Sequence, residues 1–136
     1  MSSWILKSEP STYSFEHLVR DKRATWDGVS NPQALNNIRS MKKGDRVLIY
    51  HSGEGKCCVG LAEIASDPYA DPKKNDPRLA VVDIIPKKAI TRQVTLAEIK
   101  ANPKLKDLKI VRQPRLSVIP VPDAAWEELM KMAGEK

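Results

Sequence analysis

The chain has 136 residues, 41% of them hydrophobic and 29% charged, a mix typical of one folded globular domain rather than of a disordered chain. Lys and Arg number 23 against 17 Asp and Glu, and the net charge of +6 favours an anionic partner. No uncharged stretch approaches the roughly 20 apolar residues of a membrane span, and the N-terminus lacks a secretory leader pattern. We therefore expect a cytoplasmic protein of a single domain, residues 1–136, that does not bind membranes.

The start of the chain predicts short elements separated by turns. A strand is expected over residues 4–7, and Ser14 is a suitable N-cap for a short helix over 15–20. An Asp-Gly pair then predicts a turn over 25–30, because this pair readily forms a left-handed corner.

A helix and a hairpin are expected next. Asn31 followed by Pro32 predicts a helix start, since Asn caps the backbone and Pro fits the first helical position; a Lys-Lys-Gly run marks the end. Two strand-like runs, 46–51 and 57–64, flank the Gly-rich segment 52–56. This pattern predicts a hairpin with a flexible tip.

The second half opens with a Pro-rich polar segment that predicts a loop over 66–78. A strand is expected over 79–85, ending at Pro86. A capping box at 95–98 predicts a short helix.

Strand patterns return at 108–111 and 116–121, and Asp123 is expected to cap a last helix. Four apolar residues recur at helical spacing in that helix: Trp126, Leu129, Met130 and Ala133. Short strands mixed with short helices, without long crossover helices, predict an α+β domain. Its curved, mixed, mostly antiparallel β-sheet would form a pseudo-barrel flanked by short helices.

The basic excess is concentrated in residues 87–115, where only Glu98 and Asp107 oppose the bases and the local charge is +7. Such a concentration is typical of proteins that bind polyanions, and equally of a solvated face that serves solubility. The bases are Lys87, Lys88, Arg92, Lys100, Lys104, Lys106, Lys109, Arg112 and Arg115.

Signatures of common enzymes and metal sites are missing. The sequence contains no His-Glu-x-x-His, Cys-x-x-Cys or Gly-x-Ser-x-Gly motif. The run 53–56 differs from a phosphate-binding loop, because Cys57 stands where Ser or Thr would hold magnesium. With only two histidines, a zinc site would need both adjacent cysteines, Cys57 and Cys58, which also form a poor disulfide pair. We therefore expect no metal, no cofactor and a reducing compartment.

Three polar clusters lie at the ends of predicted strands, where pockets tend to form. They occupy residues 7–10, 26–31 and 50–53. Each cluster also has a structural explanation, so no single residue decides the function.

Trp26 fits neither strand nor helix periodicity, and its ring belongs either to a site or to a secondary core. Asn31 is explained as a helix cap and His51 as a strand-end histidine, although both can border a site. Glu9 either pairs with a base such as Lys7 or lines a pocket.

Taken together, the motifs resemble the EVE domain family. The matching blocks follow the family's order and cover residues 4 to about 122: Trp4–Pro10, Thr25–Val29, Asn31, Asn37 with Arg39, Gly44–Asp45, Tyr50–Ser52 and Arg115–Val121. The resemblance implies a PUA-like fold, related to PUA, ASCH and YTH domains. It also implies a reader of modified bases in DNA or RNA. Ser30 and Pro32 depart from the usual family residues, and the Arg missing at position 30 alters either a phosphate contact or the base that is read.

On this resemblance we expect a non-catalytic module that binds nucleic acid and takes one extruded base into an aromatic-lined pocket. The base is a 5-substituted cytosine in DNA or a modified base in RNA. Trp26 would stack on it, Glu9 or Asp27 would accept from an exocyclic amine, and Val29 would contact the added methyl group. The expected pocket residues are Lys7, Ser8, Glu9, Trp26, Asp27, Val29, Asn31, His51, Ser52 and Ser117. The expected phosphate contacts are Arg39, Lys87, Lys88, Arg92, Arg112 and Arg115.

Two other classes stay open. ASCH relatives include nucleoside amidohydrolases, and Lys7 with Glu9 could supply acid–base chemistry at the mouth of the pocket, although the sequence shows no activated nucleophile. Alternatively, a protein-interaction module could present its basic face to acidic partners. We expect a monomer, since no coiled-coil heptad or long apolar edge is present.

Overall fold

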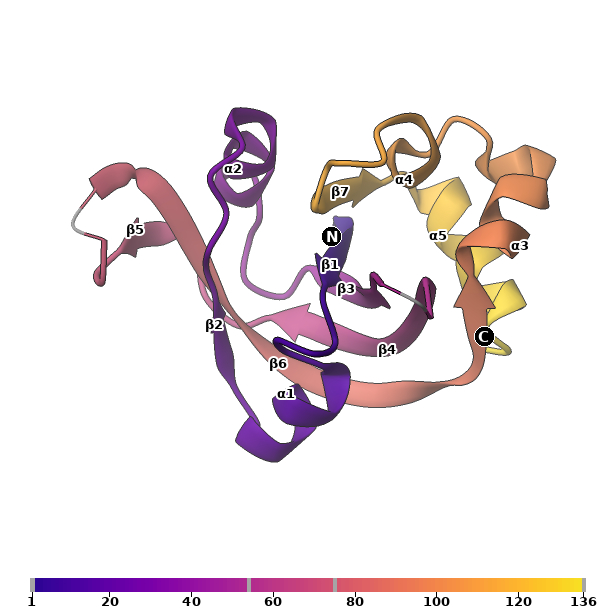
Figure 1. Cartoon of the computed structure of the whole chain (residues 1–136), viewed down its shortest axis with the longest axis horizontal. Helices are drawn as coiled ribbons and strands as arrows, with labels where there is room; N and C mark the ends of the chain where they lie inside the picture. Colours follow the sequence, from indigo (N-terminus) through magenta and orange to yellow (C-terminus); the bar gives the residue numbers. More distant parts are fainter. Residues whose placement is uncertain (1, 54, 75, 136) are drawn as a thin grey trace.

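The computed structural model describes residues 2–53, 55–74 and 76–135 (Figure 1). The predictions made for Glu54 in the hairpin tip and for Asn75 in the loop fall outside these residues. The strands are β1 (Ser3–Ser8), β2 (Ala24–Trp26), β3 (Arg46–His51), β4 (Cys57–Ile64), β5 (Tyr69–Asp71), β6 (Asp76–Thr95) and β7 (Val118–Val121). The helices are α1 (Phe15–Asp21), α2 (Pro32–Arg39), α3 (Leu96–Ala101), α4 (Lys109–Arg112) and α5 (Asp123–Met132), with a 3-10 turn, η1, at Pro103–Leu105.

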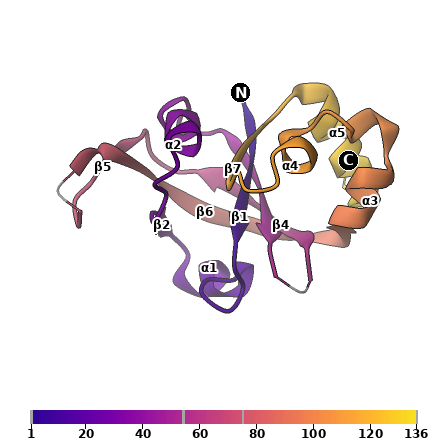
Figure 2. The ribbon, with the colours of Figure 1, turned by 45° about the horizontal axis from the view of Figure 1, so that its top comes forward.

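The strands form one curled sheet in the order β2-β6-β4-β3-β1-β7, and β5 pairs with the outer part of β6. Among the described strands, β1 and β3 run parallel and the other pairs are antiparallel. The predicted mixed, mostly antiparallel pseudo-barrel with short helices is therefore confirmed. Figures 1 and 2 show α3, α4 and α5 gathered at one end of the sheet, with the β5–β6 hairpin at the opposite end.

Helix starts are the best-predicted local features. Ser14 and Thr95 each form a capping box, and Asn31 accepts a hydrogen bond from a backbone N–H of α2, as their sequence positions indicated. Asp123 is an exception, because Pro122 occupies the N-cap position of α5 and makes no side-chain cap.

The strand predicted to end at Pro86 continues through it. Pro86 pairs with Ala62, and the register of the two strands shifts between Leu61 and Ala62. Because proline lacks a backbone N–H, it is tolerated in a strand at such an irregularity. The single long strand β6 therefore spans the sheet and pairs with β2, β4 and β5.

Two strands replace segments predicted as irregular. In the predicted turn, Thr25 and Trp26 pair with Asp83 and Val82 of β6, and the change of direction comes afterwards at Gly28, whose φ is +77°. In the predicted loop, β5 likewise pairs with β6. The partner of β2 is distant in sequence, which local patterns do not reveal, whereas β5 is one arm of a short hairpin with β6 inside a segment whose prolines predicted a loop.

The predicted strand at 108–111 is wrong, because α4 occupies most of it. Leu108 and Ile110 are both buried there, so a short apolar run fits either a strand or a helical turn. The predicted strand at 116–121 is shorter than expected and begins at Val118.

The core contains the residues that periodicity placed there. Trp4 and Trp126 are each 5% exposed and belong to one cluster of buried apolar side chains. Asp45 is also buried and accepts a hydrogen bond from Trp4 Nε1 at 3.0 Å, which ties β1 to the turn before β3. Within the described residues, no helix has the length and apolar character needed to cross a membrane.

Candidate functional site

A cavity of about 560 Å³ lies between the end of β1, the approach to α1, and β2. Seven of the ten predicted pocket residues line it: Lys7, Ser8, Glu9, Trp26, Asp27, Val29 and Ser117. The structure adds Thr12, Tyr13, Ala24, Thr25 and Gly28. Larger hollows of about 640 and 810 Å³ lie against α5, but none of the predicted pocket residues lines either of them.

Lys7 connects β1 to the segment that precedes β7. Its Nζ donates to the carbonyl oxygen of Pro114 at 2.7 Å and lies 5.7 Å from the centre of the Tyr50 ring. Its backbone N–H donates to Ser117 O at 3.0 Å. Burial lowers the pKa of Lys7 below its ordinary value. This side chain lies in the cavity wall and is held there by the segment that leads into β7, the strand next to β1.

Ser8 and Glu9 form the turn that begins the α1 side of the cavity. Ser8 Oγ donates to the carbonyl oxygen of Tyr13, and the backbone N–H groups of Thr12 and Tyr13 both donate to Glu9 O at 2.9 Å. Thr12 and Tyr13 were missed from the sequence. The Ser-Glu-Pro turn that precedes them is the one local signal that could have indicated them.

The Glu9 carboxylate lies beside the start of the β3–β4 hairpin. Its Oε2 is 3.5 Å from Ser52 Oγ, and a Cβ added to Gly53 would lie 2.9 Å from its Oε1. Glycine at position 53 therefore allows this close approach. Lys7 and Glu9 do not form an ion pair in the described structure, so the pairing considered from the sequence is absent.

Trp26 ends the edge strand β2, where its half-buried indole packs partly against the core and lines the cavity. The ring position is thus compatible with both interpretations of Trp26, as part of a site and as part of a secondary core. Asp27, Gly28 and Val29 follow in the turn and continue the same wall. The positive φ of Gly28 allows that turn, since other residues rarely adopt it.

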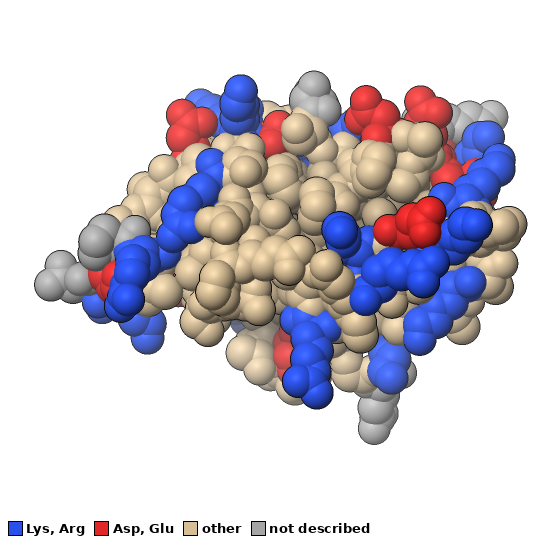
Figure 3. All heavy atoms as spheres, turned by 90° about the horizontal axis from the view of Figure 1, so that it is seen from above, with Lys and Arg blue, Asp and Glu red and all other residues tan. Residues whose placement is uncertain are grey.

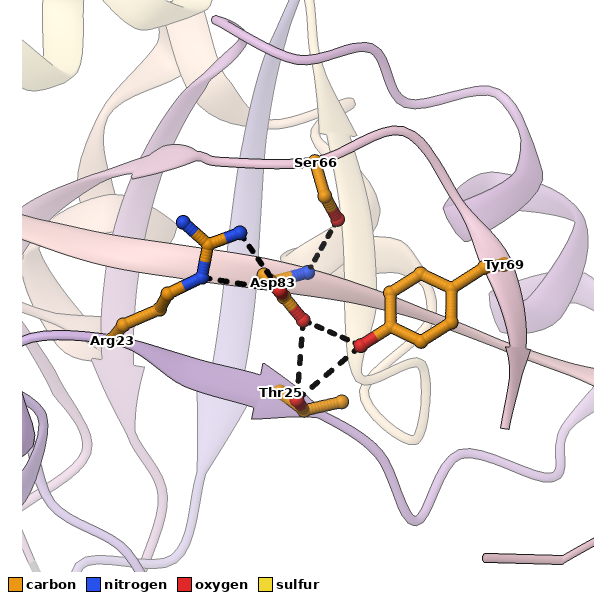
Figure 4. A network of polar contacts seen from close by, with 5 residues as sticks. All are labelled: Arg23, Thr25, Ser66, Tyr69 and Asp83. Atoms are coloured by element: carbon orange, nitrogen blue, oxygen red, sulfur yellow. Dashed lines mark hydrogen bonds and ion pairs between the residues drawn. The ribbon is translucent and has the colours of Figure 1, made fainter. Parts of the chain in front are cut away.

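A polar network fastens β2 to β6 (Figure 4). The Asp83 carboxylate accepts from Tyr69 OH at 2.6 Å, from Thr25 Oγ1 at 3.1 Å and from Arg23 Nη2 at 2.9 Å, and its backbone N–H donates to Ser66 Oγ at 3.0 Å. Burial acts to raise the pKa of Asp83, but these hydrogen bonds outweigh it and keep the pKa below its usual range. The network fixes the strand that carries Trp26.

Three predicted pocket residues lie around this cavity rather than on it. Asn31 Oδ1 accepts from the α2 backbone at 3.0 Å, and the residue borders a neighbouring hollow. His51 Nε2 accepts from the backbone N–H of Phe15 at 2.9 Å, and burial lowers the pKa of this histidine. Ser52 Oγ donates to Ser8 O at 3.3 Å. Their contacts support the elements that form the cavity.

The basic stretch 87–115 does not form one free surface. It is divided among β6, α3, η1 and α4, and four of the predicted phosphate contacts form ion pairs. The pairs are Lys87–Glu63, Lys88–Glu135, Arg92–Glu98 and Arg112–Asp107. Figure 3 shows Lys and Arg side chains toward the two ends of one face, with a mostly uncharged area between them.

The remaining two predicted phosphate contacts differ from each other. Arg39 donates to Asn36 Oδ1 at 2.9 Å and to the carbonyl oxygen of Arg78. Arg115 is exposed and borders the hollow beside the cavity. Of the six predicted bases, Arg115 alone lines the hollow that Leu116, the neighbour of Ser117, also borders.

The two cysteines and the side chain types that bind metals bear on the catalytic and metal sites considered from the sequence. Cys57 and Cys58 are buried and do not form a disulfide, and burial raises the pKa of both thiols. The described residues contain no group of three or more His, Cys, Asp or Glu side chains arranged to hold a metal ion.

The curled, mixed sheet with short helices and a cavity at its strand ends defines a PUA-like domain. The EVE domain family matches residues 2–132, and the chain belongs to that family.

Thymocyte nuclear protein 1 of Danio rerio is 28% identical, over 98% of this chain and 73% of the relative. An NMR structure of a Rhodopseudomonas palustris protein is 40% identical with a TM-score of 0.93, covering 98% of this chain and 94% of that one. The crystal structure of the human THYN1 protein in complex with DNA containing 5-methylcytosine is 26% identical with a TM-score of 0.91, covering 100% and 99% of the two chains.

Proposed function

We propose that this EVE domain binds a nucleic-acid strand and takes one modified base into the cavity between β1, α1 and β2. The base is a 5-substituted cytosine in DNA or a modified base in RNA. The observation that carries the proposal is the composition of the cavity, in which an indole, an aliphatic side chain, hydroxyls and carboxylates line about 560 Å³. The similarity to a protein crystallised with 5-methylcytosine DNA supports the choice of ligand.

The cavity residues contact different parts of the base, according to their chemistry. Trp26 stacks on the extruded base, an interaction that contributes ~1–3 kcal/mol and tolerates every base. Discrimination therefore comes from the base edge, where Ser8 and Ser117 can donate or accept, and where Glu9 or Asp27 accepts from the cytosine amine.

The modification itself contributes little by burial alone. One methyl group against Val29 adds ~0.8 kcal/mol, so hydrogen bonds at the base edge must reinforce the selectivity. Extruding a base from a duplex costs a few kcal/mol and less from a single strand, which favours single-stranded or distorted sites.

The domain acts by binding rather than by catalysis. Lys7 donates to Pro114 O and Glu9 approaches Ser52, so the two side chains that could share acid–base chemistry have separate partners. Neither cysteine is an activated nucleophile, since burial raises the pKa of both thiols.

Substitution of Trp26 tests the proposed pocket. Trp26→Ala should lower the affinity for a methylated oligonucleotide about 5- to 150-fold, because stacking is lost, and should remove the preference for the modified base, because the base is no longer held in the cavity where its edge is read. Trp26→Phe is the matched control and should retain most of the preference, since it keeps an aromatic face. Fluorescence anisotropy with labelled DNA and RNA measures both. Equal binding by Trp26→Ala and the parent protein would place the pocket elsewhere.

A further inference from the structure

A second hollow adjoins the cavity on the side of α2. It has a volume of about 350 Å³ and lies between the start of α2 and the segment that leads into β7. Figures 1 and 2 show these two segments near each other beside β1. Polar side chains dominate its lining: Asn31, Gln33, Gln113 and Arg115, together with Pro114 and Leu116.

Residues close to each other in sequence line the cavity and this hollow on two sides. On one wall, Val29 lines the cavity and Asn31 lines the hollow, a separation of at most about 7 Å along the chain. On the other wall, Ser117 lines the cavity and its neighbour Leu116 lines the hollow. A nucleic-acid strand advances roughly 3.4 Å per nucleotide along a duplex axis, so the two spaces are one or two nucleotides apart.

A bridge across the boundary fixes this arrangement. The carbonyl oxygen of Pro114, which borders the hollow, accepts from Nζ of Lys7, which borders the cavity, at 2.7 Å. The N–H of Leu116 donates to Gln113 O at 3.0 Å and closes a turn that presents Arg115. The segment is therefore held against β1 by a turn and a cation.

Arg115 differs from the other arginines in its lack of partners. Within the part of the chain that the structure describes, the other seven arginines donate side-chain hydrogen bonds or form ion pairs: Arg20, Arg23, Arg39, Arg46, Arg78, Arg92 and Arg112. Arg115 makes no such contact with the described residues. Its guanidinium is exposed at a polar hollow and has its donors available for a ligand.

We propose that this hollow binds the backbone phosphate next to the nucleotide whose base enters the cavity, with Arg115 as the phosphate ligand and the amides of Gln33 and Gln113 as further donors. The inference rests on the proposed function and specifies the path of the strand. Arg matches a phosphate because its planar guanidinium can donate two parallel hydrogen bonds. The contact is the same for DNA and RNA, because both carry this group.

Most of the basic residues predicted to contact phosphates lie away from the proposed path of the nucleic-acid strand. Lys87 and Lys88 border the hollow between β4, β6 and α5, and each is paired with a glutamate there. Arg112 is exposed like Arg115 but pairs with Asp107 at 3.2 Å. Arg112 is therefore a matched control, three positions away in the same segment.

Neutral backbone linkages test the proposal directly. The probe is a short single strand that contains one 5-methylcytosine, with a methylphosphonate in place of the phosphate on its 5′ or its 3′ side. One of these two replacements should weaken binding by the parent protein about 5- to 20-fold, since a charged hydrogen bond is lost. Arg115→Ala should bind the charged and the neutral strand equally at that linkage, whereas Arg112→Ala should keep the full difference.

Different outcomes test the assignment of Arg115 to a phosphate and the proposed recognition of a modified base. Equal sensitivity of Arg115→Ala and the parent protein to the neutral linkage would overturn the assignment of Arg115, as would a parent protein that ignores both replacements. The proposed function fails on a different comparison, in which the parent protein binds the same strand equally with cytosine and with 5-methylcytosine. Loss of the phosphate effect in Arg115→Ala supports the assignment whichever base is preferred.

Discussion

At the scale of single residues, two histidines hold the start of α1 in place. His17 Nδ1 accepts from the backbone N–H of Ser14 at 2.9 Å, and His51 Nε2 accepts from that of Phe15 at the same distance. A ring nitrogen accepts a hydrogen bond only while it is unprotonated. Because Tyr13 directly precedes this helix start and lines the cavity, the charge state of His51 bears on the cavity wall.

The stability of the protein should therefore depend on pH through His51. Burial lowers its folded pKa below the ordinary 6.5, although Glu16 and Glu9 act in the opposite direction. The stabilisation is complete above pH 6.5 and is lost as the pH falls from there through the folded pKa, because the unfolded chain binds the proton first. The effect should be about 1 kcal/mol, the net value of one hydrogen bond.

His51→Gln isolates this contribution, since a Gln side-chain oxygen can accept the same hydrogen bond without titrating. Urea unfolding between about pH 7.5 and 5 should show a smaller loss of stability for the variant than for the parent protein. Identical pH profiles would contradict this account of His51.

At the scale of elements, Gly60 shows how β4 and α1 come into contact. A Cβ at this position would lie 2.4 Å from two ring atoms of Phe15, and Phe15 is only 6% exposed. A buried ring has little room to move, so the first residue of α1 packs on β4 at a place where only glycine leaves space.

Gly60→Ala should therefore destabilise the protein by about 1–3 kcal/mol, as overpacking commonly does. Gly55→Ala is the matched control, because its Cβ would lie no nearer than 3.9 Å to the Sγ of Cys57, an ordinary contact. Urea unfolding monitored by circular dichroism measures both. A Gly60→Ala protein as stable as the Gly55→Ala control would show that α1 moves away freely.

The elements also show what the sequence can and cannot predict. Helix caps depend on residues close in sequence, so Ser14, Asn31 and Thr95 correctly predicted where α1, α2 and α3 begin. Strand β2 depends on β6, which is far away in sequence, and Pro86 is tolerated at a register shift between β6 and β4. Local patterns carry no information on either.

Some residues of the candidate site could likewise be predicted from the sequence, and others could not. The ordered motifs indicated the residues that line the cavity on β1 and β2, whereas Thr12 and Tyr13 join it through the turn at Glu9. Charge counting indicated a basic surface, but it could not show which bases pair with acids from other elements, as Lys88 does with Glu135.

At the scale of the whole molecule, the curl of the sheet creates the cavity. β2 and β7 are the two ends of the strand order, yet Trp26 at the end of β2 and Ser117 just before β7 line the same space. A flat sheet would separate them by four intervening strands. Closure of the pseudo-barrel is therefore what brings the polar ends of β1 and β2 and the residue before β7 to one cavity, while several basic side chains outside it are paired with acids.

The central claim is that the cavity reads a base, and comparison of modified and unmodified strands at two salt concentrations tests it most directly. Labelled strands with cytosine or 5-methylcytosine at one position, as DNA and as RNA, are titrated at roughly 50 and 200 mM salt. Both affinities should fall with salt, because phosphate contacts are screened, while the preference for the modified base should persist in at least one of the two nucleic acids. Equal affinity for both bases, with binding lost at the higher salt, would leave only a basic surface and contradict the account.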